Sequence, residues 1–130
     1  MQFLQPDGWP PPKGYANGVA AQGRMVFVSG MVGWDGQGKF RANDFVGQVR
    51  QALKNVVEVL AQASAEPSHI VRMSWYVLDK KTYLAALKEI GVAYREIIGS
   101  HYPAMTAVEV SGLIEDQALV EIEVTAMVPN

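Results

Sequence analysis

Two segments of this chain repeat their apolar residues at the period of an α-helix, and no other feature restricts its fold as much. In residues 44–63 the apolar side chains recur every three or four positions, which places them in one stripe along a helix. Residues 82–98 carry a second stripe of the same kind, with Gly91 inside it. Because each stripe has to be buried against another element, we predict two amphipathic helices that pack on a common surface.

That surface is a β-sheet, because the other apolar residues alternate with polar ones at the period of a strand. Strands are predicted within residues 18–33, over 69–78, and over 104–113 and 118–128, with a turn near 114–117 between the last two. Two helices can cover only one face of such a sheet. The sequence therefore predicts an α+β fold with both helices packed on one face.

Alternation along each predicted strand divides its side chains between two faces. We expect the helix-covered face to carry Val26, Val28, Val71, Met73, Trp75, Val77, Val108, Val110, Val120, Ile122 and Val124. We expect the other face to carry Met25, Phe27, Ser29, Arg72, Ser74, Tyr76, Met105, Ala107, Glu109, Leu119, Glu121, Glu123 and Met127. The second set mixes large apolar side chains with charged ones, so it suits neither a closed core nor bulk water.

Two interpretations of this second face remain open. An antiparallel sheet often keeps one face in solvent, and the polar members of the set fit that state. Large exposed apolar side chains such as Phe27 instead indicate that the face packs against copies of itself in a closed homo-oligomer. In that arrangement the charged side chains lie near a cleft between subunits, where a carboxylate can act as a general base.

Composition narrows the classes of protein that this chain can represent. A length of 130 residues suits one domain, residues 1–130, and 49% hydrophobic with 18% charged residues is ordinary for a globular protein. The absence of cysteine excludes disulfides and thiolate chemistry and fits a reducing, cytoplasmic compartment. No signal peptide or membrane span of roughly 20 apolar residues is expected, and a net charge of −2 argues against nucleic-acid binding.

Few side chains are candidates for chemistry. His69 and His101 do not have the spacing of metal ligands, so we expect neither a metal nor another cofactor. Glu121 and Glu123 point the same way along one predicted strand. They can be a pair that is solvated or ion-paired with Arg72, or they can place a general base in a cleft. The residues alone favour the solvated or ion-paired state.

Eight segments, taken in order along nearly the whole chain, resemble the RidA (YjgF/YER057c/UK114) family. The segments are Gly14-Tyr15-x-x-Gly18-Val19, Val26-Phe-Val-Ser-Gly30, Gly36-x-Gly38, Gln48-x-x-Gln51-Ala-Leu53-x-Asn55, Tyr76-Val-x-Asp79, Tyr102-Pro-Ala104, Val108-Glu-Val110 and Val120-Glu-Ile-Glu123. The resemblance implies a chorismate-mutase-like α+β fold and a homotrimer whose sheets line a central barrel. It also implies small-molecule clefts between neighbouring subunits.

Active members of that family hydrolyse reactive enamines and imines, such as 2-aminoacrylate, to a keto acid and ammonia. In them an Arg directly after the Pro-Ala pair binds the substrate carboxylate through a bidentate pair of hydrogen bonds. A Glu in the last strand positions the attacking water, and a Tyr and a Ser line the cleft. The resemblance places these last three roles on Glu121, Tyr15 and Ser29.

The Arg is the one member of this set that the chain does not have, because Met105 stands in its position. A thioether cannot replace a charged, bidentate hydrogen-bond donor. Losing such a contact costs about 1.5–3 kcal/mol of binding free energy. Either the substrate lacks the carboxylate, or Arg72 or Arg24 supplies the contact, or the chain does not catalyse this reaction. Met105 also makes the cleft more apolar, which suits a larger or less charged ligand.

Three functions follow from these observations. The first is a RidA-like hydrolase, with Glu121 as the catalytic residue and Tyr15, Ser29, Met105 and Arg72 binding the substrate. The second is a non-catalytic trimer that binds a small molecule in its intersubunit cleft. The third is an endoribonuclease or translation inhibitor, which the acidic net charge makes the least supported of the three.

Overall fold

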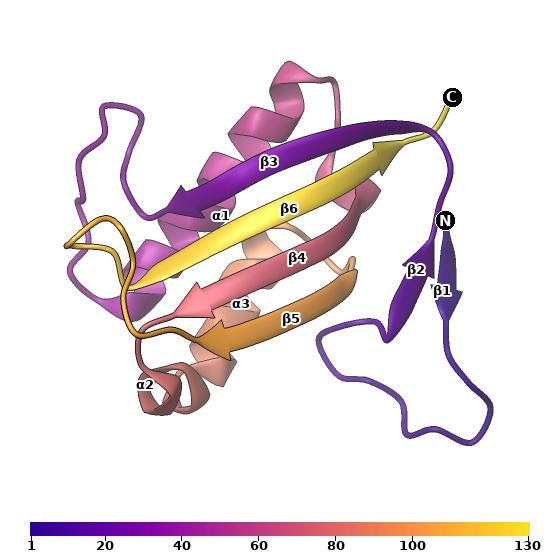
Figure 1. Ribbon diagram of the computed structural model, residues 1–130, viewed down its shortest axis with the longest axis horizontal. Coiled ribbons are helices and arrows are strands. Elements are labelled where there is room, and N and C mark those ends of the chain that lie inside the picture. Colours follow the sequence, from indigo (N-terminus) through magenta and orange to yellow (C-terminus); the bar gives the residue numbers. More distant parts are fainter.

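Four strands form the main sheet of the computed structural model, which describes residues 1–130. Across the sheet lie β3 (Arg24–Val32), β6 (Val120–Val128), β4 (Ile70–Val77) and β5 (Ala104–Glu109), in that order. β6 runs antiparallel to both of its neighbours, whereas β4 and β5 are parallel. Figure 1 looks onto the sheet face that has no helix over it.

The helices lie behind the sheet in Figure 1, so the predicted two-layer α+β architecture is confirmed. They are α1 (Phe45–Gln62), α2 (Lys80–Ala85) and α3 (Leu87–Ile97), with a short 3-10 turn, η1 (Pro67–His69), before β4. The prediction of one helix over 82–98 was wrong in two respects. The helical segment starts earlier, because Asp79 caps it by accepting a hydrogen bond from the Lys81 N–H, and it breaks at Ala86. None of these helices is long and apolar enough to cross a membrane.

The segment before β3 forms a second, smaller sheet. β1 (Gln2–Leu4) pairs antiparallel with β2 (Gly18–Ala20), and the chain between them loops out beyond the end of the sheet where β5 begins. The Ala16 N–H donates to the Pro103 carbonyl at 2.9 Å, which fixes this arm to the start of β5. The arm therefore brings residues from the beginning of the chain to the β5 edge.

A core of 19 buried residues lies between the helices and the sheet. α1 inserts Leu53 and Leu60, which are completely buried, and the sheet contributes Met73, Trp75 and Ile122. Burying side chains of this size stabilises the fold by about 1.5–3 kcal/mol each. The predicted helix-covered side chains of β3 and β6, and all but the first of those predicted for β4, are confirmed by this core.

The exception in β4 is Val71, which is only half-buried because Ile70 takes its place in the core. The pairing with β6 shifts register between Ile70 and Arg72, so the alternation of the strand starts one residue later than predicted. A bulge of this kind leaves no trace in a period-two pattern. From Arg72 onwards the two faces of β4 are as predicted.

The prediction for β5 was wrong, because its two faces are exchanged. Met105 lies opposite the buried Met73, and Ala107 lies opposite Trp75, so both face the helices. Glu109 also lies on that side, where its carboxylate accepts a hydrogen bond from the Lys80 N–H at 2.7 Å. Val108 lies on the open face instead and is exposed. β5 is an edge strand that the helices cover only in part, so burial does not fix which of its faces is apolar.

Candidate functional site

The open face of the sheet holds a hollow of about 450 Å³ that brings two of the predicted site residues together. Ser29 enters it from β3 and Arg72 from β4, and Glu123 lies between them on the central strand β6. Phe27, which is 69% exposed, forms one wall. This face therefore has the mixture of polar and exposed apolar side chains that the alternation of the strands predicts.

Glu121 lies next to this hollow, over the backbone of β3. A Cβ atom added at Gly30 would come within 2.0 Å of its Oε2 atom, so only a glycine at position 30 leaves room for the carboxylate. The pairing of β3 with β6 shifts register between Val28 and Met31, and Ser29 and Gly30 fall in that irregular stretch. None of the side-chain hydrogen bonds or ion pairs within the chain involves Glu121. The carboxylate is thus held in place by packing and is free to bind water or a ligand.

Glu123 differs from Glu121 because it has a partner on β4. Its Oε1 accepts a hydrogen bond of 2.5 Å from the Tyr76 hydroxyl, and this contact is the main cause that raises the pKa of Tyr76. Neither glutamate is ion-paired with Arg72, since both ion pairs of the chain lie elsewhere. Arg72 and Glu121 therefore both remain available to a ligand.

Tyr15 and Met105 lie apart from Ser29 and Glu121, towards the β5 edge of the sheet. Tyr15 is 42% exposed and precedes the residue that pairs with the start of β5. Met105 is half-buried and lines a pocket on the helix side, not the open face. Ser29 and Glu121 lie on the β3–β6 side of the sheet. The family resemblance places these four residues in one cleft, but within one chain they form two separate groups.

Arg24 and the two histidines make structural contacts within the chain. Arg24 donates from Nη2 to the Ala63 carbonyl at 2.7 Å, at the end of α1. The Glu66 N–H donates to Nδ1 of His69 at 3.0 Å, and the Nε2 atom of His101 lies 2.6 Å from the Ile70 carbonyl. No group of three His, Cys, Asp or Glu side chains is placed to hold a metal ion.

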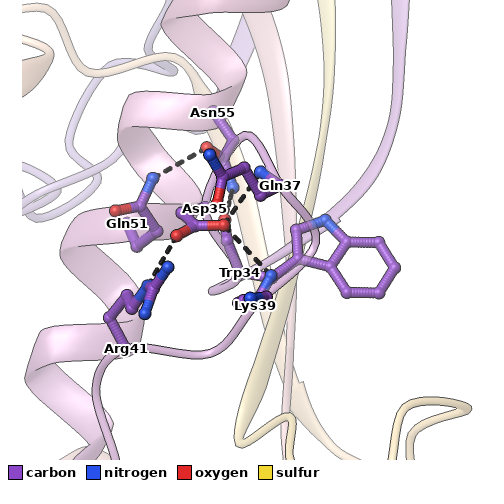
Figure 2. A network of polar contacts seen from close by, with 7 residues as sticks. All are labelled: Trp34, Asp35, Gln37, Lys39, Arg41, Gln51 and Asn55. Carbon is purple, nitrogen blue, oxygen red and sulfur yellow. Dashed lines mark hydrogen bonds and ion pairs between the residues drawn. The ribbon is translucent and has the colours of Figure 1, made fainter.

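The loop that follows β3 is ordered by a polar network, shown in Figure 2. Asp35 accepts hydrogen bonds from the Gln37 and Lys39 N–H groups and pairs with Nε of Arg41 at 2.7 Å. Asn55 of α1 donates to the Val32 carbonyl at 3.0 Å and to the Trp34 carbonyl at 2.7 Å. The network ties the end of β3 to α1, and β3 is the strand that carries Ser29 and Gly30.

Replacing Asp35 by Asn should destabilise the protein in a pH-dependent way. Hydrogen bonding from Arg41, followed by that from the Lys39 and Gln37 N–H groups, lowers the pKa of Asp35 from 3.8 to about 2. A carboxyl whose pKa is lower when folded stabilises the native state above pH 3.8, and that contribution disappears as the pH falls through about 2.

Thermal unfolding of D35N should therefore show a lower Tm than wild type at pH 7 and the same Tm near pH 2. Asp7→Asn, in the exposed arm, is the matched control and should not change Tm at either pH. A difference in Tm between D35N and wild type that stays constant down to pH 2 would contradict this account.

The structure also brings together residues that sequence reasoning did not select. Trp75 was expected only to fill the core, yet its Nε1 atom is the one buried side-chain polar atom without a hydrogen-bond partner. It lines the same helix-side pocket as Met105, together with Lys13 from the arm and Arg95 from α3. No periodicity could have indicated this group, because its members come from four separate segments of the chain.

Comparison with known proteins assigns the chain to a family. A family model described as Endoribonuclease L-PSP matches residues 9–128. A RutC family protein of Pyrococcus horikoshii is 31% identical over 118 residues, which cover 90% of each chain. A 2-iminobutanoate/2-iminopropanoate deaminase of Salmonella typhimurium is 30% identical over 116 residues, which cover 87% of this chain and 84% of that protein.

Solved structures agree with the sequence matches. A protein of the conserved Rid family from Yersinia pestis superimposes with a TM-score of 0.85 at 32% identity, and the match covers 98% of both chains. E. coli TdcF, solved with bound serine, has a TM-score of 0.68 at 29% identity and the same coverage. The chain therefore belongs to the RidA (YjgF/YER057c/UK114) family.

Proposed function

We propose that this protein hydrolyses a reactive enamine or imine metabolite to a carbonyl compound and ammonia. The observation that carries the proposal is the carboxylate of Glu121, which lies over Gly30 and beside Ser29 without a partner inside the chain. Relatives named as deaminases of 2-iminobutanoate and 2-iminopropanoate support the reaction class. The resemblance supports it as well, because it implies that Glu121 positions the attacking water and that Tyr15 and Ser29 line the cleft.

The chemistry needs only water and a positioned base. Glu121 accepts a proton from water as the water oxygen bonds to the imine carbon, and the same carboxylate returns a proton to the nitrogen. This gives a carbinolamine. Its hydroxyl proton then passes to the nitrogen, the carbon–nitrogen bond breaks, ammonia leaves, and the carbonyl product remains. An enamine first takes up a proton at carbon and loses one from nitrogen to become the imine. General base catalysis of this kind contributes about 10²–10⁴-fold to the rate.

The cleft is proposed to form between subunits of a homotrimer. Tyr15 and Met105 lie at the β5 edge, whereas Ser29 and Glu121 lie on the β3 and β6 half of the sheet. One chain therefore does not assemble all four around a single ligand. The exposed Phe27 and Met25 on the open face fit burial against neighbouring sheets. Light scattering should give three times the mass of one chain. A reducing compartment such as the cytoplasm is part of this proposal, since the chain has no cysteine.

The test of the reaction is release of ammonia from a panel of freshly generated imines and enamines. The panel should include small 2-imino acids, 2-imino acids with large apolar side chains, and imines without a carboxylate, because Met105 replaces the family Arg. Turnover of any class above the spontaneous rate supports the proposal. A protein of the correct mass and fold that accelerates none of the panel would rule it out.

Restoring the family Arg by Met105→Arg should raise kcat/KM for small 2-imino acids by about tenfold or more, because a charge-assisted contact is worth about 1.5–3 kcal/mol. Met105 is half-buried at a sheet edge, so an arginine there can keep its charged group in solvent when no ligand is bound. Met105→Leu is the control, since it changes shape without adding charge. Equal kcat/KM values for the two variants would show that position 105 does not contact the carboxylate.

A non-catalytic trimer that binds a small molecule is the second candidate, and Met105 is the observation that favours it. Such a protein would bind a ligand with and without the Glu121 carboxylate and release no ammonia. Endoribonuclease activity has less support, because Glu121 and Glu123 outnumber Arg72 on the open face and would repel phosphates. RNA cleavage that persists through repurification and disappears with Glu121→Gln would overturn that judgement.

A further inference from the structure

A pocket of about 320 Å³ lies on the helix side of the sheet, between α3 and the edge formed by β4 and β5. Its size is at the lower end of the range of small-molecule sites, which is about 300–1,000 Å³. Most of its wall is aromatic or apolar. The side chains that form this wall include Trp75, Tyr83, Ile90, Tyr94, Tyr102 and Met105. A ring or a branched apolar group would pack well against these surfaces.

The wall also contains one hydrogen-bond donor without a partner. Trp75 is 2% exposed, and its indole N–H makes no hydrogen bond within the chain. Buried donors of this kind nearly always have a partner, so an acceptor that reached this indole would find its N–H unpaired. Trp75 packs edge-on against Tyr83 with ring centroids 6.5 Å apart, which fixes the indole in the wall.

The charges that line the pocket are both positive. Lys13 reaches it from the N-terminal arm and Arg95 from α3, and no Asp or Glu lines it. Neither cation belongs to an ion pair of the chain. A Cβ atom added at Gly91 would lie 3.3 Å from Nη1 of Arg95, which places the guanidinium over this glycine. An anion on the ligand would therefore find two unpaired cations at this pocket.

We propose that this pocket binds a carboxylic acid that carries an aromatic or bulky apolar group. The apolar group lies among the tyrosines and Met105, beside the indole of Trp75, and the carboxylate meets Lys13 or Arg95. The identification of this acid with the substrate rests on the proposed function. It would make the substrate a 2-imino acid with a large side chain, and its carboxylate would be held by cations other than the family Arg.

The direct test uses 3-phenylpropionate, an unreactive acid, and the indole N–H signals of ¹⁵N-labelled protein. Trp75→Phe identifies the signal of Trp75 among the three tryptophans. We expect 3-phenylpropionate to shift that signal, propionate to leave it unchanged at the same millimolar concentration, and the neutral 3-phenylpropanamide to bind about tenfold more weakly. An unshifted Trp75 signal, or an equal response to propionate, would overturn the proposal.

Variants of α3 provide a second test. Gly91→Leu should fill the pocket and abolish binding, whereas Val92→Leu, on a neighbouring exposed position, should bind 3-phenylpropionate like wild type. Arg95→Gln should weaken binding about tenfold, and Lys88→Gln on the same helix should not. If Gly91→Leu does not fold, the Arg95 and Lys88 pair decides the question, and equal affinities for those two variants would contradict the proposal.

These measurements do not depend on turnover. Binding of 3-phenylpropionate without ammonia release from any imine would leave this inference standing and remove the proposed function. Turnover of small imines without a response of the Trp75 signal to 3-phenylpropionate would support the proposed function and overturn this inference.

Discussion

Glu121→Gln is expected to lower kcat for ammonia release by about 10²–10⁴-fold, while KM for the same substrate changes little. The amide has nearly the shape of the carboxylate, so it fits over Gly30 in the same way, but it cannot accept a proton from water. The loss should therefore fall on the chemical step. Initial rates with the best imine of the panel, measured at several concentrations, give both constants.

The control for this variant is Glu58→Gln on α1, which removes an equal charge on the helix side of the sheet. It should leave kcat unchanged. A Glu121→Gln protein that keeps full kcat would show that the base lies elsewhere, and Glu123 would be the next candidate because it lines a pocket on the open face together with Glu121. A variant that loses affinity and kcat together would instead indicate that Glu121 contacts the substrate before reaction.

Gln48→Leu is expected to destabilise the fold by about 3 kcal/mol, because it leaves several backbone groups without partners. Gln48 is 2% exposed and is the one buried polar side chain of the chain. Its Nε2 donates to the Gln117 carbonyl at 2.9 Å and to the Ala42 carbonyl at 3.2 Å, and its Oε1 accepts from the Leu119 N–H at 2.8 Å. One side chain of α1 thus holds the chain that leads into β6 and Glu121.

Urea unfolding of Gln48→Leu and of Gln62→Leu, an exposed position near the end of the same helix, would measure this difference. The control should differ from wild type by less than about 0.5 kcal/mol. If Gln48→Leu proved equally stable, the apolar side chain would have compensated the lost hydrogen bonds, and the loop before β6 would not depend on them. Its effect on kcat, measured well below the unfolding midpoint, would show whether that loop positions Glu121.

The class of fold could be predicted because the helices and the central strands have one face that must be buried. In α1 the apolar stripe from Phe45 to Leu60 is the face that enters the core, and Met73, Trp75 and Val77 behave in the same way in β4. Burial free energy acts on each of these side chains, so their spacing records the geometry of the element. The order of the eight family segments then identified the relatives.

The candidate site could be predicted only in part. The alternation of β3, β4 and β6 placed Ser29, Arg72 and Glu121 on one open face, and the structure has them there. It did not reveal that Glu123 pairs with Tyr76 while Glu121 has no partner, because such contacts depend on which strands are neighbours. The break at Ala86 was also missed, since the apolar stripe continues through it.

The sequence by itself determined the two-layer fold, the family and the identity of the residue that replaces the family Arg. Only the tertiary structure decided where that residue points. Met105 lies on an edge strand whose two faces are both partly exposed, so no burial requirement fixes its direction, and the parallel register with β4 turns it towards the helices. The same register places it in one pocket with Trp75, which is 30 residues away in the sequence, and no local pattern can encode such an arrangement.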